Sequence, residues 1–231
     1  MKKLVCIIAV CFGLNGMAQS DNDNNARLDN IGINDFGNGM WVNSSGQKTD
    51  IKGSPYLYDS WVNGGKVFLS NKVISIKSFN YNIKFERFEA KISKDSVFAV
   101  DPQGVKKIEI LGNVFIRTLD PEFQRNSYFQ KIAAINGKLL LEKHIVELKE
   151  GQINPMTMQK MEKDALIKKE IFYLANDKGE KLKKFKLRKR SILSLLDKSK
   201  ASSVKDFVKQ NRLKFTDPKD VKALLEYSKT I

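Results

Sequence analysis

His144 is the one histidine of the chain, and it is the first residue to consider for chemistry. It lies between Lys143 and Ile145 in a pattern typical of a β-strand. A single imidazole cannot build a site of several histidines, and no Glu-x-x-His or Gly-x-Ser-x-Gly motif is present. We therefore expect a structural histidine with a satisfied hydrogen bond, and we predict no metal site and no cofactor.

Three glutamates in strand-like segments, Glu86, Glu89 and Glu109, are the carboxylates to consider for acid–base chemistry. Glycoside hydrolysis needs two carboxylates on either side of the scissile bond, and spacing along the chain does not reveal them. Because no motif marks these glutamates, we expect them to face solvent and predict no catalytic residue. A glycan-active hydrolase that uses Glu86 and Glu89 is kept as an alternative.

The segment Asp21–Asn25 begins like a calcium-binding loop, with oxygen-bearing side chains at alternate positions. The sixth position is Ala26 and the twelfth is Gly32, where such a loop needs glycine and a bidentate glutamate. The motif therefore fails, and we predict no calcium site.

The N-terminus resembles an export signal in its composition. Lys2 and Lys3 precede an apolar run from Leu4 to Leu14, and small residues at Gly16 and Ala18 precede Gln19. We predict a signal over residues 1–18, cleaved near Ala18–Gln19, and a periplasmic or extracellular location. No later run is long and apolar enough for a transmembrane helix, so we predict no transmembrane segment.

Both cysteines, Cys6 and Cys11, fall inside the predicted signal. Cleavage would leave no thiol, which excludes disulfides, cysteine nucleophiles and cysteine metal sites from the mature chain. Residues 19–50 then form a leader rich in Asn, Asp and Gly, which we expect to be flexible.

The chain carries a formal net charge of +15, and its last third is the most basic part. The densest run of cations, which we call the basic segment, consists of Lys181, Lys183, Lys184, Lys186, Arg188, Lys189 and Arg190. One interpretation is a solvated strand with Leu182, Phe185 and Leu187 turned partly inward. The other is an electrostatic binding surface. In an exported protein, anionic envelope lipids or polysaccharide are the expected partners rather than nucleic acid.

Residues 51–190 alternate between apolar and polar residues, which is typical of β-strands. Asn136-Gly137, Gly112-Asn113 and the run from Asn176 to Gly179 each separate two such segments, and Asn-Gly favours a type I′ hairpin turn. We predict an α+β fold: a mainly antiparallel β meander, as a sandwich or as an open barrel or half-barrel. The polar segment 152–169 is expected to be a loop or a short helix that crosses the sheet.

Residues 191–231 change to helical spacing and predict a short C-terminal helical tail packed on the β domain. Ser191, Ser202 or Ser203, and Thr216 or Asp217 are the expected N-caps, the last followed by Pro218. The apolar stripes are Ile192, Leu195 and Leu196; Val204, Phe207 and Val208; and Val221, Leu224 and Leu225.

Several short stretches resemble a group of exported proteins from Bacteroidetes-type bacteria that has no established activity. They are Gln19 after the signal, residues 52–57 (Lys-Gly-Ser-Pro-Tyr-Leu), residues 80–83 (Asn-Tyr-Asn-Ile), residues 137–140 (Gly-Lys-Leu-Leu), residues 172–174 (Phe-Tyr-Leu), residues 191–193 (Ser-Ile-Leu), residues 211–215 (Asn-Arg-Leu-Lys-Phe) and residues 224–227 (Leu-Leu-Glu-Tyr). The resemblance implies an exported protein and assigns no functional residue. Asn80 stands where members of this group usually carry arginine.

Taken together, these patterns predict a secreted or periplasmic, non-catalytic envelope protein that binds an anionic or amphiphilic envelope component. The main alternative is a carrier of lipid or another apolar ligand in an open barrel, and the hydrolase is the third.

Overall fold

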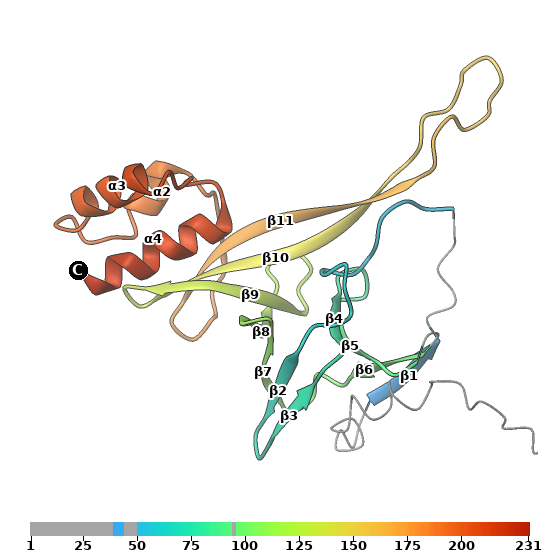
Figure 1. Ribbon diagram of the computed structural model, residues 1–231, viewed down its shortest axis with the longest axis horizontal. Helices are drawn as coiled ribbons and strands as arrows, with labels where there is room; N and C mark the ends of the chain where they lie inside the picture. Colours follow the sequence, from blue (N-terminus) through green and yellow to red (C-terminus); the bar gives the residue numbers. More distant parts are fainter. Residues whose placement is uncertain (1–38, 44–49, 94–95) are drawn as a thin grey trace, which may run out of the picture.

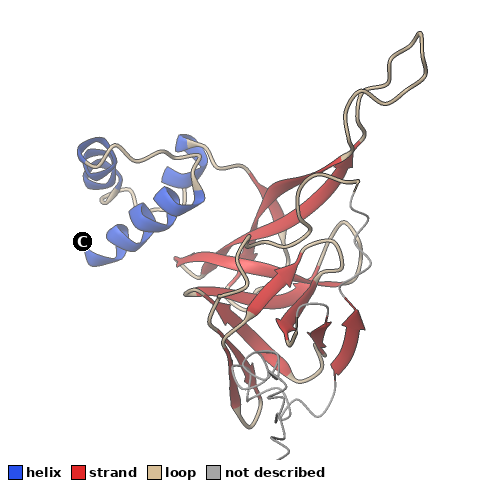
Figure 2. Ribbon diagram, turned by 45° about the vertical axis from the view of Figure 1, so that its right-hand side comes forward, coloured by secondary structure: helices blue, strands red, loops and turns tan. Residues whose placement is uncertain are grey.

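The computed structural model describes residues 39–43, 50–93 and 96–231, which form two antiparallel sheets and a group of helices (Figures 1 and 2). The predicted signal, most of the predicted leader and the Asp21–Asn25 segment lie outside the described residues. The strands are β1 (Gly39–Asn43), β2 (Gly65–Leu69), β3 (Val73–Ile76), β4 (Phe79–Asn82), β5 (Arg87–Lys91), β6 (Ser96–Val100), β7 (Val105–Ile110), β8 (Asn113–Leu119), β9 (Asn126–Ile135), β10 (Lys138–Lys149), β11 (Ala165–Asn176) and β12 (Lys183–Phe185). The helices are α2 (Lys189–Leu193), α3 (Ala201–Gln210) and α4 (Pro218–Thr230).

Sheet A has four strands in the order β1-β6-β5-β4, and sheet B has eight in the order β12-β11-β10-β9-β8-β7-β2-β3. From β7 to β12 each strand pairs with the next one along the chain. Short connections make such a meander the direct result of successive hairpins. The predicted α+β fold, with antiparallel sheets and a C-terminal helical tail, is confirmed.

Turn chemistry fixes the hairpins of sheet B. Asn136 and Gly137 both have positive φ, 46° and 68°, and they connect β9 to β10 as predicted. The preceding turn differs from the prediction by one residue, because Leu111 and Gly112 adopt positive φ, 49° and 75°, and Asn113 already belongs to β8.

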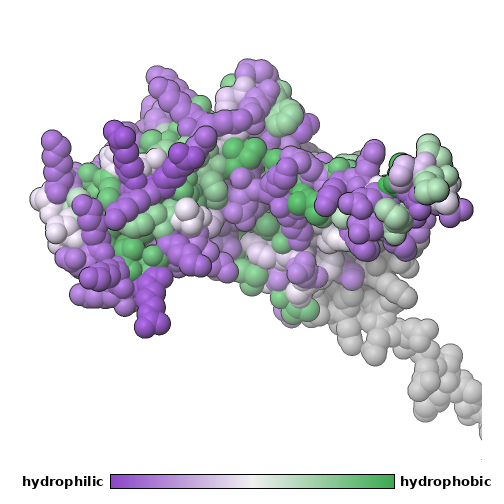
Figure 3. All heavy atoms as spheres, turned by 90° about the horizontal axis from the view of Figure 1, so that it is seen from above, coloured by the Kyte–Doolittle hydropathy of each residue, from purple (hydrophilic) through white to green (hydrophobic). Residues whose placement is uncertain are grey.

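The segment 152–169 is neither a loop throughout nor a helix. Its last residues belong to β11, which begins at Ala165 opposite Lys149 of β10, so the two strands form a long projecting arm (Figure 1). The prediction was wrong because most of this part of β11 is exposed, and a strand without a buried face shows no apolar alternation. Hydrophobic side chains gather at the end of the arm (right in Figure 3), where Met156 and Met158 are 92% and 76% exposed.

The largest hydrophobic core lies between sheet A and the β2, β3, β7 and β8 part of sheet B. Its centre is a group of aromatic rings. The ring centroid of Phe88 of sheet A lies 5.2 Å from that of Phe115 and 4.8 Å from that of Tyr128, both of sheet B, and both pairs have edge-to-face geometry. Such contacts add to the apolar area that the rings bury, and they define how the two sheets face each other.

The helices form a second core with β9, β10 and the connection after β12. The three predicted apolar stripes all point into it, and Val204, Val221 and Leu224 are fully buried. Asp217 caps α4 by accepting hydrogen bonds from the amides of Lys219 and Asp220, as the sequence suggested. The serine caps were wrong: Lys200 precedes α3, and Arg188 precedes α2.

One buried cation links the two sheets. Lys143 of β10 has a side chain only 1% exposed, and its ammonium group binds Asp120, which lies between β8 and β9. The same nitrogen is 3.1 Å from Oε1 of Glu86, in the turn between β4 and β5 of sheet A. Burial raises the pKa of Asp120, but the Lys143 hydrogen bond and two backbone amides outweigh it, so the pKa is lowered.

Removing this cation should destabilise the protein strongly, because Asp120 would be left buried without a counter-charge. We expect Lys143→Ala to lower the free energy of unfolding by about 3–5 kcal/mol in urea denaturation. Lys169→Ala is the matched control, since Lys169 forms an exposed ion pair with Glu147 on the same pair of strands. That change should cost at most about 1 kcal/mol. Equal losses in the two variants would contradict the role given to Lys143.

Candidate functional site

A groove of about 1000 Å³ lies over β7 and β8, beside the connection between β11 and β12. The alternation of side chains along β8 determines which residues form the floor of the groove. Phe115 of β8 points into the core between the sheets, so its neighbours Val114 and Ile116 point to the opposite face and line the groove. The full lining is Lys106, Lys107, Val114, Ile116, Arg117, Thr118, Leu119, Pro121, Gln124, Asn126, Lys131, Leu139, Asp177, Lys178, Glu180, Lys181 and Leu182.

The β11–β12 connection is held against β8 by one tight contact. The Thr118 hydroxyl donates a 2.7 Å hydrogen bond to the carbonyl of Gly179. Gly179 has a φ of +78°, and a Cβ placed on it would come within 2.9 Å of Ile116. This position therefore requires glycine both for its backbone conformation and for its packing.

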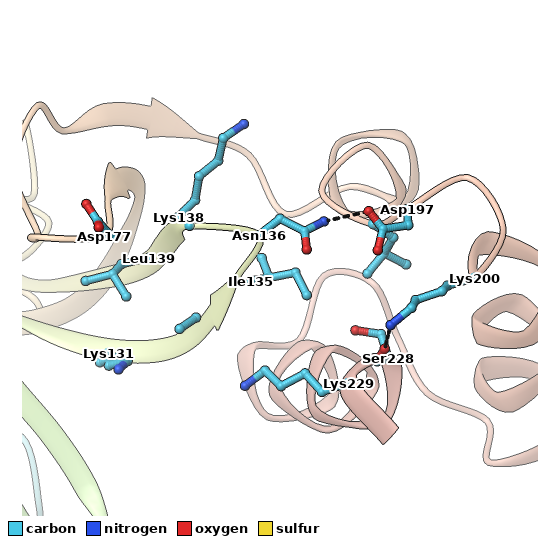
Figure 4. A pocket seen from close by; sticks show the side chains of 13 residues that line it. Lys131, Ile135, Asn136, Lys138, Leu139, Asp177, Asp197, Lys200, Ser228 and Lys229 are labelled. Atoms are coloured by element: carbon cyan, nitrogen blue, oxygen red, sulfur yellow. Dashed lines mark hydrogen bonds between the residues drawn. The ribbon is translucent and has the colours of Figure 1, made fainter. Parts of the chain in front are cut away.

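A second hollow, of about 540 Å³, adjoins the first and shares Lys131, Leu139 and Asp177 with it. It lies between the β9–β10 turn and the helices (Figure 4). Asn136 closes one side by donating hydrogen bonds to the carbonyl of Leu195 and to Asp197, at 3.0 and 3.2 Å. The hollow therefore continues the groove toward the helical tail.

The groove combines a positive rim with an apolar floor. Six cations line it against two carboxylates, Asp177 and Glu180. The apolar residues of its floor include Val114, Ile116 and Leu182. Arginine and lysine bind phosphate and carboxylate groups, while apolar walls bind alkyl or ring surfaces. An anionic amphiphile presents both kinds of group.

Of the basic segment, only Lys181 lines the groove. Lys183 and Lys184 lie on β12, where Lys184 pairs with Glu122, and Lys189 and Arg190 begin α2. All seven side chains of the segment lie on exposed residues, with Lys186 and Arg188 in the connection between β12 and α2. The structure therefore spreads the basic segment along an edge of the molecule and does not gather it into one site.

Sequence reasoning missed the other cations of the groove, Lys106, Lys107, Arg117, Lys131 and Lys178. They come from three strands and one connection, and only the pairing of β7, β8 and β9 brings them together. The alternation of β8 indicates only the apolar floor, because Val114 and Ile116 lie on the face opposite Phe115. It gives no signal for the cations, since Arg117 shares the face of Phe115.

Two of the glutamates proposed for hydrolysis do not face solvent as expected. Glu89 is fully buried and holds Tyr56, Asn82 and Arg87 at 2.7, 3.1 and 2.5 Å. Glu86 accepts a hydrogen bond from Ser127 at 2.8 Å and pairs with Lys143. The expectation failed because each carboxylate gained partners from distant segments, which offset the cost of burial.

The third glutamate, Glu109, lies half-buried on β7 opposite Lys66 of β2. Opposite charges at directly paired strand positions stabilise a sheet modestly. All three glutamates thus have positions that the two sheets explain.

A group of side chains that could act as metal ligands lies around His144. Its Nδ1 is 3.8 Å from Glu142, and its Nε2 bonds Oε1 of Gln130 at 2.9 Å. Glu170 of β11 lies directly opposite His144, and one donor atom from each of Glu142, His144 and Glu170 lies within 4.8 Å of the others. The sequence showed Glu142 two residues before His144 but not the cross-strand partner.

Burial shifts the pKa values of Glu142 and His144 in opposite directions. Desolvation, with the nearby charges of Glu170 and Asp217, raises the pKa of Glu142 to about 8. Desolvation, with the charge of Lys168, lowers the pKa of His144 to about 4. Burial therefore disfavours the charged form of both groups.

No family model, curated protein or solved structure matches the chain. Among the described residues, no helix is long and apolar enough to cross a membrane.

Gly179→Ala tests how the β11–β12 connection shapes the groove. A left-handed backbone costs an L-residue about 1–2 kcal/mol, and the contact with Ile116 adds to this cost. Gly104→Ala is the matched control, since Gly104 has a φ of +72° and open space around it. We expect the Gly179 variant to lose more free energy of unfolding in urea denaturation than the control. Equal losses would mean that the packing on Ile116 is unimportant.

Glu142→Gln tests the buried carboxyl group. Its pKa of about 8 in the folded protein lies above the ordinary 4.5, so its contribution to stability is present below pH 4.5 and is lost as the pH rises toward 8. Glutamine removes that loss. We expect the variant to gain stability over the wild type as the pH rises through this range, in urea denaturation with a chelator present. Parallel pH curves for the two proteins would contradict the assigned titration.

Proposed function

We propose that the protein is an exported, non-catalytic envelope protein that binds an anionic amphiphile in the groove over β7 and β8. One observation carries the proposal: cationic residues from three strands and from the β11–β12 connection line a groove with an apolar floor. Its volume of about 1000 Å³ is at the upper end of the usual range for small-molecule pockets, roughly 300–1000 Å³. The ligand class is an acidic lipid or another alkyl-bearing anion of the bacterial envelope.

The N-terminal sequence supports the location. The lysines and apolar run of residues 2–14 resemble an export signal, and an envelope offers abundant lipid phosphates. An anionic polysaccharide would match the cations but would leave Ile116 and Leu182 without apolar partners. A neutral lipid would leave the cations without counter-charges. The mixed lining therefore favours an anionic amphiphile over both.

The test compares two charge-matched triple variants. Lys131→Ala, Lys178→Ala and Lys181→Ala remove cations from the groove, whereas Lys186→Ala, Arg188→Ala and Lys189→Ala remove the same charge from the basic segment outside it. Binding of a single-chain alkyl phosphate, measured by calorimetry, should weaken about tenfold in the groove variant only, since each exposed cation contributes up to about 1 kcal/mol.

Two controls measure the same binding at different ionic strengths and with amphiphiles of different headgroup charge. Affinity should fall as ionic strength rises, because exposed charges are screened over about 8 Å at physiological strength. A zwitterionic or uncharged amphiphile with the same chain should bind more weakly. Binding that is unchanged in the groove variant, or equal for the uncharged amphiphile, would overturn the proposal. Loss in the basic-segment variant alone would move the site to that segment.

A further inference from the structure

The donor cluster of Glu142, His144 and Glu170 contains a buried carboxyl group with few polar partners. Glu142 is only 3% exposed. Within the part of the chain that the structure describes, its carboxylate accepts no hydrogen bond, and the polar contact it makes is the 3.8 Å approach to Nδ1 of His144. Glu89, equally buried, has three partners. A buried carboxyl group that accepts no hydrogen bond is costly to ionise, and a bound cation would offset that cost.

The hydrogen bond of His144 sets which of its nitrogen atoms can bind that cation. Nε2 lies 2.9 Å from Oε1 of Gln130, and an amide oxygen only accepts, so Nε2 carries the proton. In the neutral ring, Nδ1 therefore presents its lone pair, and it faces Glu142. A carbonyl that holds the outer nitrogen of a histidine is the usual support for a metal-bound imidazole.

Cross-strand pairing supplies the third donor. His144 and Glu170 are directly paired on β10 and β11, so their side chains share one face with Glu142, two residues away. The three donor atoms lie within 4.8 Å of one another. Bonds of about 2.0–2.2 Å to a tetrahedral ion place ligand atoms about 3.4 Å apart. Glu170 is exposed, so its side chain is free to make this adjustment and leaves the site open to solvent.

We propose that Glu142, Nδ1 of His144 and Glu170 bind a divalent transition-metal ion of the Zn²⁺ class. One imidazole and two carboxylates suit Zn²⁺ and its neighbours better than Ca²⁺ or Mg²⁺, which prefer oxygen alone. Three protein ligands leave a position for a fourth, non-protein ligand. Lys168, whose charge acts on His144, stands on the neighbouring strand and pairs with Asp59. This site is separate from the groove and does not depend on its proposed ligand.

The single histidine makes the test direct, because every imidazole signal in the NMR spectrum of the full chain belongs to His144. We expect titration with Zn²⁺ alone to shift the ¹⁵N resonance of Nδ1 and to saturate at one ion per chain. Glu142→Gln and Glu170→Gln should each weaken this response at least about tenfold. Glu147→Gln, an exposed change on the same strand, should leave it unaltered.

Glu170 is on the surface, so its substitution tests the site even if the change at Glu142 disturbs folding. Zinc bound elsewhere, for example by Cys6 and Cys11, would leave the imidazole resonances in place and would overturn the proposal. A shift of Nδ1 that is equally strong in Glu142→Gln and Glu170→Gln would also overturn it, since it would reduce the site to a lone histidine.

Discussion

The buried ammonium group of Lys143 is the constraint on which the arrangement of the two sheets depends. A charge without water must have counter-charges at fixed positions. Here Asp120 comes from the β8–β9 connection of sheet B and Glu86 from the β4–β5 turn of sheet A. The ring of Phe123 lies 4.5 Å from the same nitrogen and covers it. These ion pairs therefore join the two sheets.

Strand β10 connects this constraint to the two candidate sites. Successive side chains of a strand point to opposite faces, so Lys143 serves the ion network while Glu142 and His144 form the donor cluster on the other face. Nearer the start of the strand, Leu139 belongs to the groove. One strand thus fixes a structural ion pair, a candidate metal site and part of a candidate ligand site, which explains why it carries polar residues at buried positions.

Features that depend on a few consecutive residues could be predicted from the sequence, whereas features that depend on contacts between distant strands could not. The Asn136-Gly137 turn and the Asp217 cap were predictable because each depends on a few consecutive residues. The early start of β11 was not, because its pairing with β10 stabilises a first half of the strand whose residues are mostly exposed. The grouping of the groove cations and the pairing of His144 with Glu170 both depend on the register between neighbouring strands. The alternation of residues within one strand does not determine that register.

The lysines of β12 have a consequence for self-association. β12 is the terminal strand of sheet B, only three residues long, and its outer backbone groups have no neighbouring strand within the described part of the chain. Such an edge is a template for the strand of another molecule and hence for aggregation. Lys183 and Lys184 lie on it, and although Lys184 pairs with Glu122, an identical edge brought alongside would still meet the charge of Lys183. Part of the basicity of this segment thus protects a sheet that would otherwise be open to growth.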